Sequence, residues 1–268
     1  MKIFISADIE GTTGIAHWDE TEKNHPDWKY FSDQMSREVA AACQGAMDAG
    51  CDDIVVKDAH DSARNINPRL LPECVRLHRG WERKPGSMMA GLDASFDGCV
   101  FTGYHSGAGW NTSPLSHTMN LANCYVKING ERVSEMTINA MAAACLGVPL
   151  LCVTGDKGLC EAVRAANPHI ETVAVNEGCG NGVLSIHPEL ALRRIREAVK
   201  RSMEKPDLKL MLYPLPDRFE VEICYKKHAS ALSGAQYPGV RQIDDTTVSY
   251  ETRDYAEVLR AFKFILCE

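Results

Sequence analysis

Apolar residues occur along the chain in short runs that alternate with stretches of helical spacing. Runs typical of buried strands lie at residues 2–7, 53–57, 98–103, 149–154 and 171–175. Apolar positions repeat at the spacing of amphipathic helices in residues 33–49, 157–166 and 188–203. Gly50 ends the first of these helices and Pro188 opens the last. The strand–helix–strand order predicts parallel strands joined by right-handed crossovers.

Weaker patterns complete the predicted fold. We expect a strand at 74–78, short helices at 87–92 and after 225, a hairpin at 124–128 and 131–133, a helix at 135–146, strands at 219–225 and 246–250, and a closing helix at 255–266. Residues 11–31 are expected to form a long irregular excursion with several aromatic residues. The predicted fold is α/β: a mixed, mostly parallel central sheet flanked by helices, with a smaller C-terminal α/β portion.

The segment at 205–216 contains prolines and is the candidate domain boundary. We therefore expect a main domain of residues 1–204 and a C-terminal portion of residues 205–268 packed on it. The predicted strands of the main domain end in acidic and imidazole side chains, so the functional site is expected in this domain.

Composition narrows the classes of partner. The 268 residues are 45% hydrophobic, which allows a sizeable core, and the net charge of -7 argues against a nucleic-acid partner. No apolar run is long enough to span a bilayer, and the N-terminus has a strand pattern rather than that of a signal peptide. The eleven cysteines are odd in number and form no CxxC pair, which favours the reducing cytoplasm over a disulfide framework.

Ligand-type residues follow three of the predicted strands. Asp8 and Glu10 come at the end of the first strand and share one face of an extended segment. His60 and His105 follow the strands at 53–57 and 98–103, and Glu135 opens the helix after the hairpin. Parallel strands end at the same edge of a sheet, so these side chains are expected to meet there. Two adjacent carboxylates stay ionised together only beside a compensating cation or strong donors.

This set of donors predicts a metal site. Carboxylates with neutral imidazoles suit zinc, with manganese and cobalt as alternatives. Five protein ligands exceed the usual set of one catalytic zinc, so we expect two ions per subunit that share Asp8 as a bridge. Such a pair can hold a hydroxide and polarise a carbonyl, lowering the pKa of water towards about 7. Any one of these residues alone is more often a solvated or capping group; their joint placement is what favours the metal site.

Three further residues each have two interpretations. His117 follows a Gly/Ser/Pro-rich loop at 106–116. It is either a mobile acid or base beside a metal, or a histidine at the edge of the hairpin that is bonded to backbone. Asp58 is either a group that orients His60 or a surface or structural acid. Asp156 either belongs to the same sheet edge as the site or caps a helix.

The segment Glu10-Gly-Thr-Thr-Gly14 faintly suggests a phosphate cradle. It lacks the lysine and hydroxyl residue of a P-loop. We interpret its glycines instead as positions that let the backbone approach the metals.

The ordered set Ser6-Ala-Asp8-Ile-Glu10-Gly11, Asp58-Ala-His60, Gly103-Tyr-His105, Ser116-His117 and Ser134-Glu135 resembles the bacterial D-aminopeptidase family of dinuclear zinc metallopeptidases. The resemblance implies that Asp8, Glu10, His60, His105 and Glu135 bind two zinc ions. It also implies that His117 is catalytic, as nucleophile or base. The implied activity is removal of an N-terminal residue, D-amino acids included, from short peptides. A ring-like homo-oligomer, a decamer in the type case, is implied as well.

Other functions stay open at this point. A two-metal site serves a phosphoesterase or another amidohydrolase equally well. A ring-forming binding protein without activity is disfavoured because all five positions hold competent ligands. The sequence leaves the choice between D and L substrates open.

Overall fold

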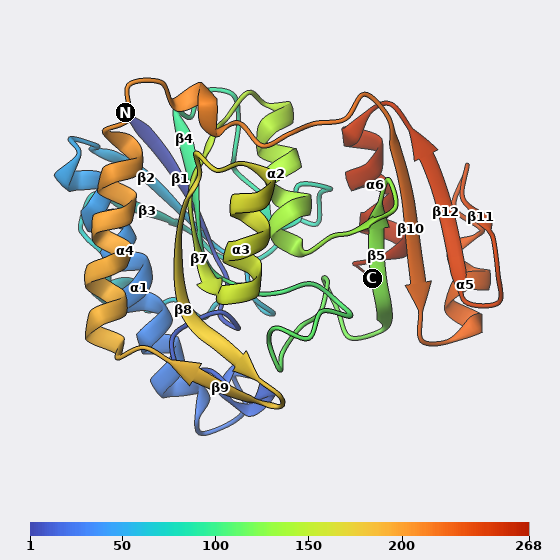
Figure 1. The fold of residues 1–268 in the computed structure, drawn as a ribbon, viewed down its shortest axis with the longest axis horizontal. Coiled ribbons are helices and arrows are strands. Elements are labelled where there is room, and N and C mark those ends of the chain that lie inside the picture. Colours follow the sequence, from blue (N-terminus) through green and yellow to red (C-terminus); the bar gives the residue numbers. More distant parts are fainter. Residues whose placement is uncertain (268) are drawn as a thin grey trace.

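The chain builds two sheets, and its larger one is the predicted central sheet. The computed structural model describes residues 1–267 (Figure 1). The larger sheet has the order β3-β2-β1-β4-β7-β8-β9. Its strands are β1 (Lys2–Ala7), β2 (Asp53–Asp58), β3 (Val75–His78), β4 (Gly98–Tyr104), β7 (Leu150–Asp156), β8 (Glu171–Cys179) and β9 (Gly182–Ser185). The pairs from β3 to β8 are parallel and β9 is antiparallel, which confirms the predicted fold class.

Helices cover both faces of this sheet. On one face, α1 (Trp28–Asp48) packs against α4 (Pro188–Met203) (Figure 1). On the other side, α2 (Glu135–Cys145) lies between the main sheet and the second sheet, and α3 (Lys157–Ala166) follows β7. The strands β1, β4 and β7 are almost entirely buried between these layers, so their apolar side chains form the core.

The second sheet is antiparallel and draws on two distant parts of the chain. Its order is β11-β12-β10-β5-β6. The strands are β5 (Asn123–Ile128), β6 (Glu131–Arg132), β10 (Phe219–Tyr225), β11 (Arg241–Gln242) and β12 (Thr247–Thr252), accompanied by α5 (His228–Gly234) and α6 (Tyr255–Ile265). Tyr255 of α6 donates a hydrogen bond to the carbonyl of Ile138 in α2, at 2.8 Å. The domain boundary at residue 204 stays a prediction, and β5 and β6 come from before it.

Several elements differ from the sequence-based expectation. The helix α1 begins at Trp28, five residues before the predicted start, because Trp28 and Phe31 continue the apolar face of the helix against the core. The predicted helix at 87–92 is a single 3-10 turn, η3 (Ser87–Met89). The remaining 3-10 turns are η1 (Trp18–Glu20), η2 (Pro68–Leu70) and η4 (Leu208–Met211). The short strands β9 and β11 were not predicted, because each owes its extended form to a neighbouring strand.

Strand order fixes where a ligand site can form. The chain runs from β1 to β2 and β3 on one side and then places β4 on the other side of β1. Open α/β sheets bind ligands beyond the carboxyl ends of their strands at such a reversal. The segments that follow β1, β2 and β4 therefore share one edge of the sheet, as the sequence predicted.

Two glycines bring the ends of β1 and β4 into contact. The N–H of Gly11 donates to the carbonyl of Gly103 at 2.8 Å. A Cβ at Gly11 would lie 1.9 Å from the carbonyl oxygen of Tyr104, and Gly103 has a left-handed φ of +67°. Gly11 is therefore required for packing of backbone against backbone. The expectation that the glycines of this segment let the backbone approach the metals stays a prediction.

In the part of the chain that the structure describes, no helix has the length and apolar character needed to cross a membrane.

Replacing Gly11 tests this packing. Gly11→Ala forces β1 and β4 apart at the edge where the site forms, so we expect a loss of about 1–3 kcal/mol of unfolding free energy. Urea unfolding followed by circular dichroism measures it. Gly182→Ala is the matched control, because a Cβ there meets only an ordinary contact at 3.6 Å. Equal stability of the two variants would contradict the account.

Candidate metal centre

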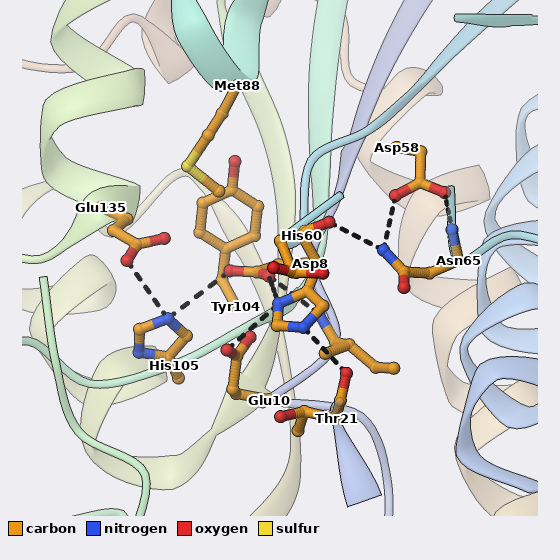
Figure 2. Close-up of polar contacts among 12 residues, drawn as sticks. Asp8, Glu10, Thr21, Asp58, His60, Asn65, Met88, Tyr104, His105 and Glu135 are labelled. Carbon is orange, nitrogen blue, oxygen red and sulfur yellow. Dashed lines mark hydrogen bonds and ion pairs between the residues drawn. The ribbon is translucent and has the colours of Figure 1, made fainter. Parts of the chain in front are cut away.

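Three carboxylates and three imidazoles converge beyond the carboxyl ends of β1, β2 and β4. They are Asp8, Glu10, His60, His105, His117 and Glu135, and most of them are shown in Figure 2. Asp8 and Glu10 follow β1, His60 lies two residues beyond β2, and His105 follows β4. Glu135 is the first residue of α2, which Ser134 caps by accepting a hydrogen bond from the N–H of Thr137 at 3.3 Å. The structure thus brings together all six residues that the sequence singled out.

The five candidate ligands form two groups that share Asp8. In the first group, His60 Nδ1 lies 3.4 Å from Asp8 Oδ1 and 3.1 Å from Glu10 Oε1. In the second, His105 Nε2 lies 3.5 Å from Asp8 Oδ2 and 3.6 Å from Glu135 Oε1. The ligand atoms of each group lie within 4.8 Å of one another. The two oxygens of Asp8 therefore face different histidines.

Buried atoms without partners show that a cation fits here. Asp8 Oδ2, Glu10 Oε2 and His105 Nε2 are buried and have no hydrogen-bond partner. Buried polar atoms are almost always paired, so orphaned acceptors around one point indicate a missing positive group. Carboxylate oxygens with imidazole nitrogens are a donor set of zinc and similar divalent ions. The residues present therefore fit the metal that the sequence predicted.

Backbone carbonyls orient each imidazole. His105 Nδ1 lies 3.0 Å from the Ser106 carbonyl, and His60 Nε2 lies 3.0 Å from the Thr21 carbonyl. His117 Nδ1 lies 2.8 Å from the Leu115 carbonyl. A carbonyl only accepts, so each of these ring nitrogens carries the proton. The opposite nitrogen faces the carboxylates and offers a lone pair when it is unprotonated, which is how metal-binding histidines are usually held.

Asp156 and Asp58 are buried and support the candidate ligands indirectly, through neighbouring residues. Asp156 accepts hydrogen bonds from the Ser106 N–H and hydroxyl, both at 2.6 Å, and caps α3 at the Leu159 N–H, at 2.9 Å. It therefore fixes the residue whose carbonyl holds His105, and the cap interpretation is confirmed as well.

Asp58 supports His60 through a neighbouring residue. It accepts from the Asn65 N–H at 2.5 Å and from the Asn65 side chain at 3.0 Å. Asn65 Nδ2 also donates to the His60 carbonyl at 2.7 Å (Figure 2). Asp58 thus orients the backbone of His60, and the imidazole itself is held by Thr21.

Charges inside the cluster are mutually stabilised. Burial raises the pKa of Asp8, but its contacts with His105 and His60 outweigh burial and bring the pKa below its usual value. Burial likewise raises the pKa of Glu135, but its interactions with His105 and His117 together outweigh burial and lower the pKa below its usual value. For the imidazoles burial lowers the pKa, whereas Glu10 and Asp8 raise that of His60, and Glu135 and Asp8 that of His105, well above the usual range. Asp8 and Glu135 therefore favour the charged forms of the two histidines, and the histidines favour the charged forms of these two acids.

His117 lies at the side of the cluster that faces the cavity. Its ring stacks on His105 with centroids 4.1 Å apart and an interplanar angle of 7°, and Trp18 packs edge-on against it at 5.1 Å. His117 Nε2 is 3.4 Å from Glu135 Oε1 and 3.8 Å from Glu10 Oε1. It also lies within ligand reach of Glu10 and His105. Its catalytic role stays a prediction.

A cavity of about 680 Å³ opens above the cluster. Its walls include side chains that the sequence did not single out for a site: Trp18, Thr21, Trp81, Met88, Met119, Lys263 and Cys267. Residues 18–24 belong to the aromatic excursion, which was expected to be functional or a contact surface and proves to be a wall of the cavity. Lys263 of α6 and Cys267 come from the end of the chain, so the C-terminal segment contributes to the cavity.

Buried carboxylates and imidazoles around two adjacent ion positions are typical of metal-dependent hydrolases. The chain matches the Peptidase_M55 family, described as D-aminopeptidase, over residues 1–264, and it belongs to that family. This confirms the resemblance found in the sequence.

Two relatives carry the comparison further. The chain is 29% identical over 266 residues to a D-aminopeptidase of Bacillus subtilis (strain 168), covering 97% of this chain and 95% of the relative. Its fold matches, with a TM-score of 0.91 and 28% identity, the solved structure of "Zn-dependent D-aminopeptidase DppA from Bacillus subtilis, a self-compartmentalizing protease". That match covers 98% of this chain and 95% of the other.

Metal binding should depend steeply on pH. His60 and His105 have raised pKa values in the metal-free protein, and they must lose their protons to become ligands. The affinity for Zn²⁺ should therefore fall as the pH decreases below the folded-state pKa values. Calorimetric titration with Zn²⁺ in buffers of different ionisation enthalpy should show proton release at neutral pH. Binding without proton release would contradict the assignment of these two ligands.

Proposed function

We propose that this protein is a zinc-dependent aminopeptidase that removes the N-terminal residue of short peptides, including peptides of D-amino acids. The observation that carries the proposal is the buried cluster of acids and imidazoles at the base of the cavity, with its orphaned ligand atoms. Membership of a family described as D-aminopeptidase supports the bond that is cleaved. The relative described as zinc-dependent supports the metal.

Two ions per subunit are proposed from the two ligand groups. One ion would be held by Asp8, Glu10 and His60, and the other by Asp8, His105 and Glu135. Asp8 would join them, because its two oxygens face the two histidines separately. Zinc, when bound, polarises a substrate carbonyl and makes water easier to ionise.

We propose that His117 transfers protons during hydrolysis. Its Nδ1–H is fixed on the Leu115 carbonyl, so Nε2 carries the lone pair and faces the carboxylates and the cavity. We assign Nε2 as the base that accepts a proton from the attacking water and returns it to the leaving amine. Stacking on His105 and contact with Trp18 hold the ring in this orientation.

The surroundings of the cluster favour a small substrate. Trp18, Trp81 and Met88 line the cavity around the buried acids. A volume of about 680 Å³ is in the range of pockets that enclose a small molecule or a short peptide, and is too small for a folded protein.

The activity test compares substrates and metals together. Metal-free protein should be inactive, and zinc should restore hydrolysis with saturation near two ions per chain. A panel of D- and L-aminoacyl dipeptides, N-acetylated dipeptides and phosphate monoesters separates an aminopeptidase from other two-metal hydrolases. We expect cleavage of dipeptides with a free amino terminus. Dipeptides that begin with a D-residue should be cleaved faster than those that begin with the L-residue.

A matched pair of variants assigns the role of His117 in the same assay. His117→Gln should lower kcat by about 10²–10⁴-fold while zinc content stays unchanged. His228→Ala, an exposed histidine on α5, should behave as wild type. Cleavage of phosphate esters alone, or no zinc-dependent hydrolysis, would overturn the proposed function.

We also propose a cytoplasmic homo-oligomer, a decamer by resemblance. The cysteines of residues 1–267 form no disulfide with one another, which suits a reducing compartment. The relative of known structure is described as self-compartmentalizing, which supports assembly around an enclosed space. Light scattering should give a mass near ten times the 29.6 kDa of one chain. A monomer at micromolar concentration would contradict the assembly.

A further inference from the structure

Strained backbone is concentrated around the cavity. Over residues 1–267, six residues other than glycine have a left-handed φ, and four of them line the cavity: Asp61, Arg83, Ser87 and Met119. A left-handed conformation costs a residue with a Cβ free energy, and it persists where the surroundings enforce it. Met119 has the largest of these angles, φ +65°. It is also the only apolar residue among the four.

Met119 is the central residue of an unusually tight turn. The N–H of Asn120 donates to the carbonyl of Thr118, two residues earlier, at 2.8 Å. A three-residue turn with this positive central φ is rare and strained. Strained backbone of this kind is found mostly at functional sites. The position of this turn beside the candidate metal ligands therefore indicates a functional role for Met119.

Neighbouring groups hold this turn from several sides. The Thr118 hydroxyl donates to the Val133 carbonyl at 3.1 Å and accepts from the Ala108 N–H at 3.0 Å. The Thr118 carbonyl also accepts from the Asn123 side chain at 2.8 Å. Asn120 donates through Nδ2 to the Leu266 carbonyl at the end of the chain. The strained conformation is therefore imposed by the loop, the hairpin and the C-terminal segment together.

The turn fixes Met119 relative to a candidate metal ligand. The N–H of Met119 donates to Glu135 Oε1 at 2.6 Å, which is the oxygen that faces His105 and His117. Met119 lines the cavity, packs against the core and has Leu121, Met88 and Trp18 as fellow lining residues. One residue thus combines a backbone bond to the reacting centre with an apolar side chain in the wall.

We propose that Met119 is a specificity-determining residue, which limits the size of the apolar side chain that the N-terminal residue of the substrate places beside Glu135. The assignment rests on the proposed aminopeptidase function. A short N-terminal side chain fits beside Met119. Leucine and phenylalanine at this position compete with the Met119 side chain for space.

The first variant is Met119→Ala, assayed on dipeptides that differ only in an N-terminal alanine, leucine or phenylalanine. The ratio of kcat/KM for leucine over alanine should increase about tenfold or more, since one or a few methylene groups in an apolar pocket change discrimination by that order. Leu184→Ala, which removes an exposed side chain on β9, is the control and should leave the ratio unchanged.

Met119→Gly separates side chain from backbone. Glycine adopts this φ without strain and keeps the N–H that contacts Glu135, so this variant should fold even if Met119→Ala does not. It should show the same change in substrate preference, and its zinc content should match that of wild type. A merely structural role of Met119 would alter stability and leave the preference unchanged.

A binding measurement distinguishes failure of this proposal from failure of the proposed function. The hydroxamates of alanine, leucine and phenylalanine are titrated calorimetrically into zinc-loaded protein. Tighter binding of the leucine compound relative to the alanine compound in Met119→Ala supports the assignment even if no peptide is cleaved. Unchanged ratios in both the kinetic and the binding series overturn it.

Discussion

Repulsion among three buried carboxylates is the constraint that the rest of the structure satisfies. Asp8, Glu10 and Glu135 are each 2–4% exposed. Asp8 lies within 4.8 Å of ligand atoms from each of the other two. At this separation, two like charges repel by about 3 kcal/mol even with a generous effective dielectric constant near 20. Two such pairs amount to a large share of the net stability of a typical domain, so the acids stay together only because positive groups share their space.

The protein supplies these positive groups in a form that a metal can replace. The acids raise the pKa of both His60 and His105, and a backbone carbonyl on the far side of each ring aims the ring at the acids. The same aim presents a lone pair once the proton leaves. Metal and proton therefore compete for one set of atoms.

Much of this site could be predicted from sequence because strand topology concentrates it. Asp8, His60 and His105 each end a clear apolar run, and parallel strands bring such ends together. The central sheet, its main helices and the donor set follow from patterns within a few residues. His117 was singled out from its loop and from the family resemblance, and it lies beside the predicted ligands.

The parts that sequence did not predict depend on contacts between distant segments. Thr21 orients His60 from within a stretch read as irregular, and Trp18 packs against His117 from the same stretch. The role of Gly11 became visible only against the carbonyl of Tyr104. Met119 carries no local signal of a left-handed turn, since glycine or asparagine would be usual there. Each of these features is set by a partner far away in the chain, which a local pattern does not contain.

The bond from Asn120 to Leu266, with Cys267 in the cavity wall, has a practical consequence for work with the purified protein. An affinity tag or fusion partner joined to the carboxyl terminus would follow closely on Cys267, a residue of the cavity wall, and would compete with the substrate for this space. The amino terminus precedes β1 and lies at the opposite edge of the main sheet (Figure 1). A tag joined at Met1 therefore lies away from the cavity.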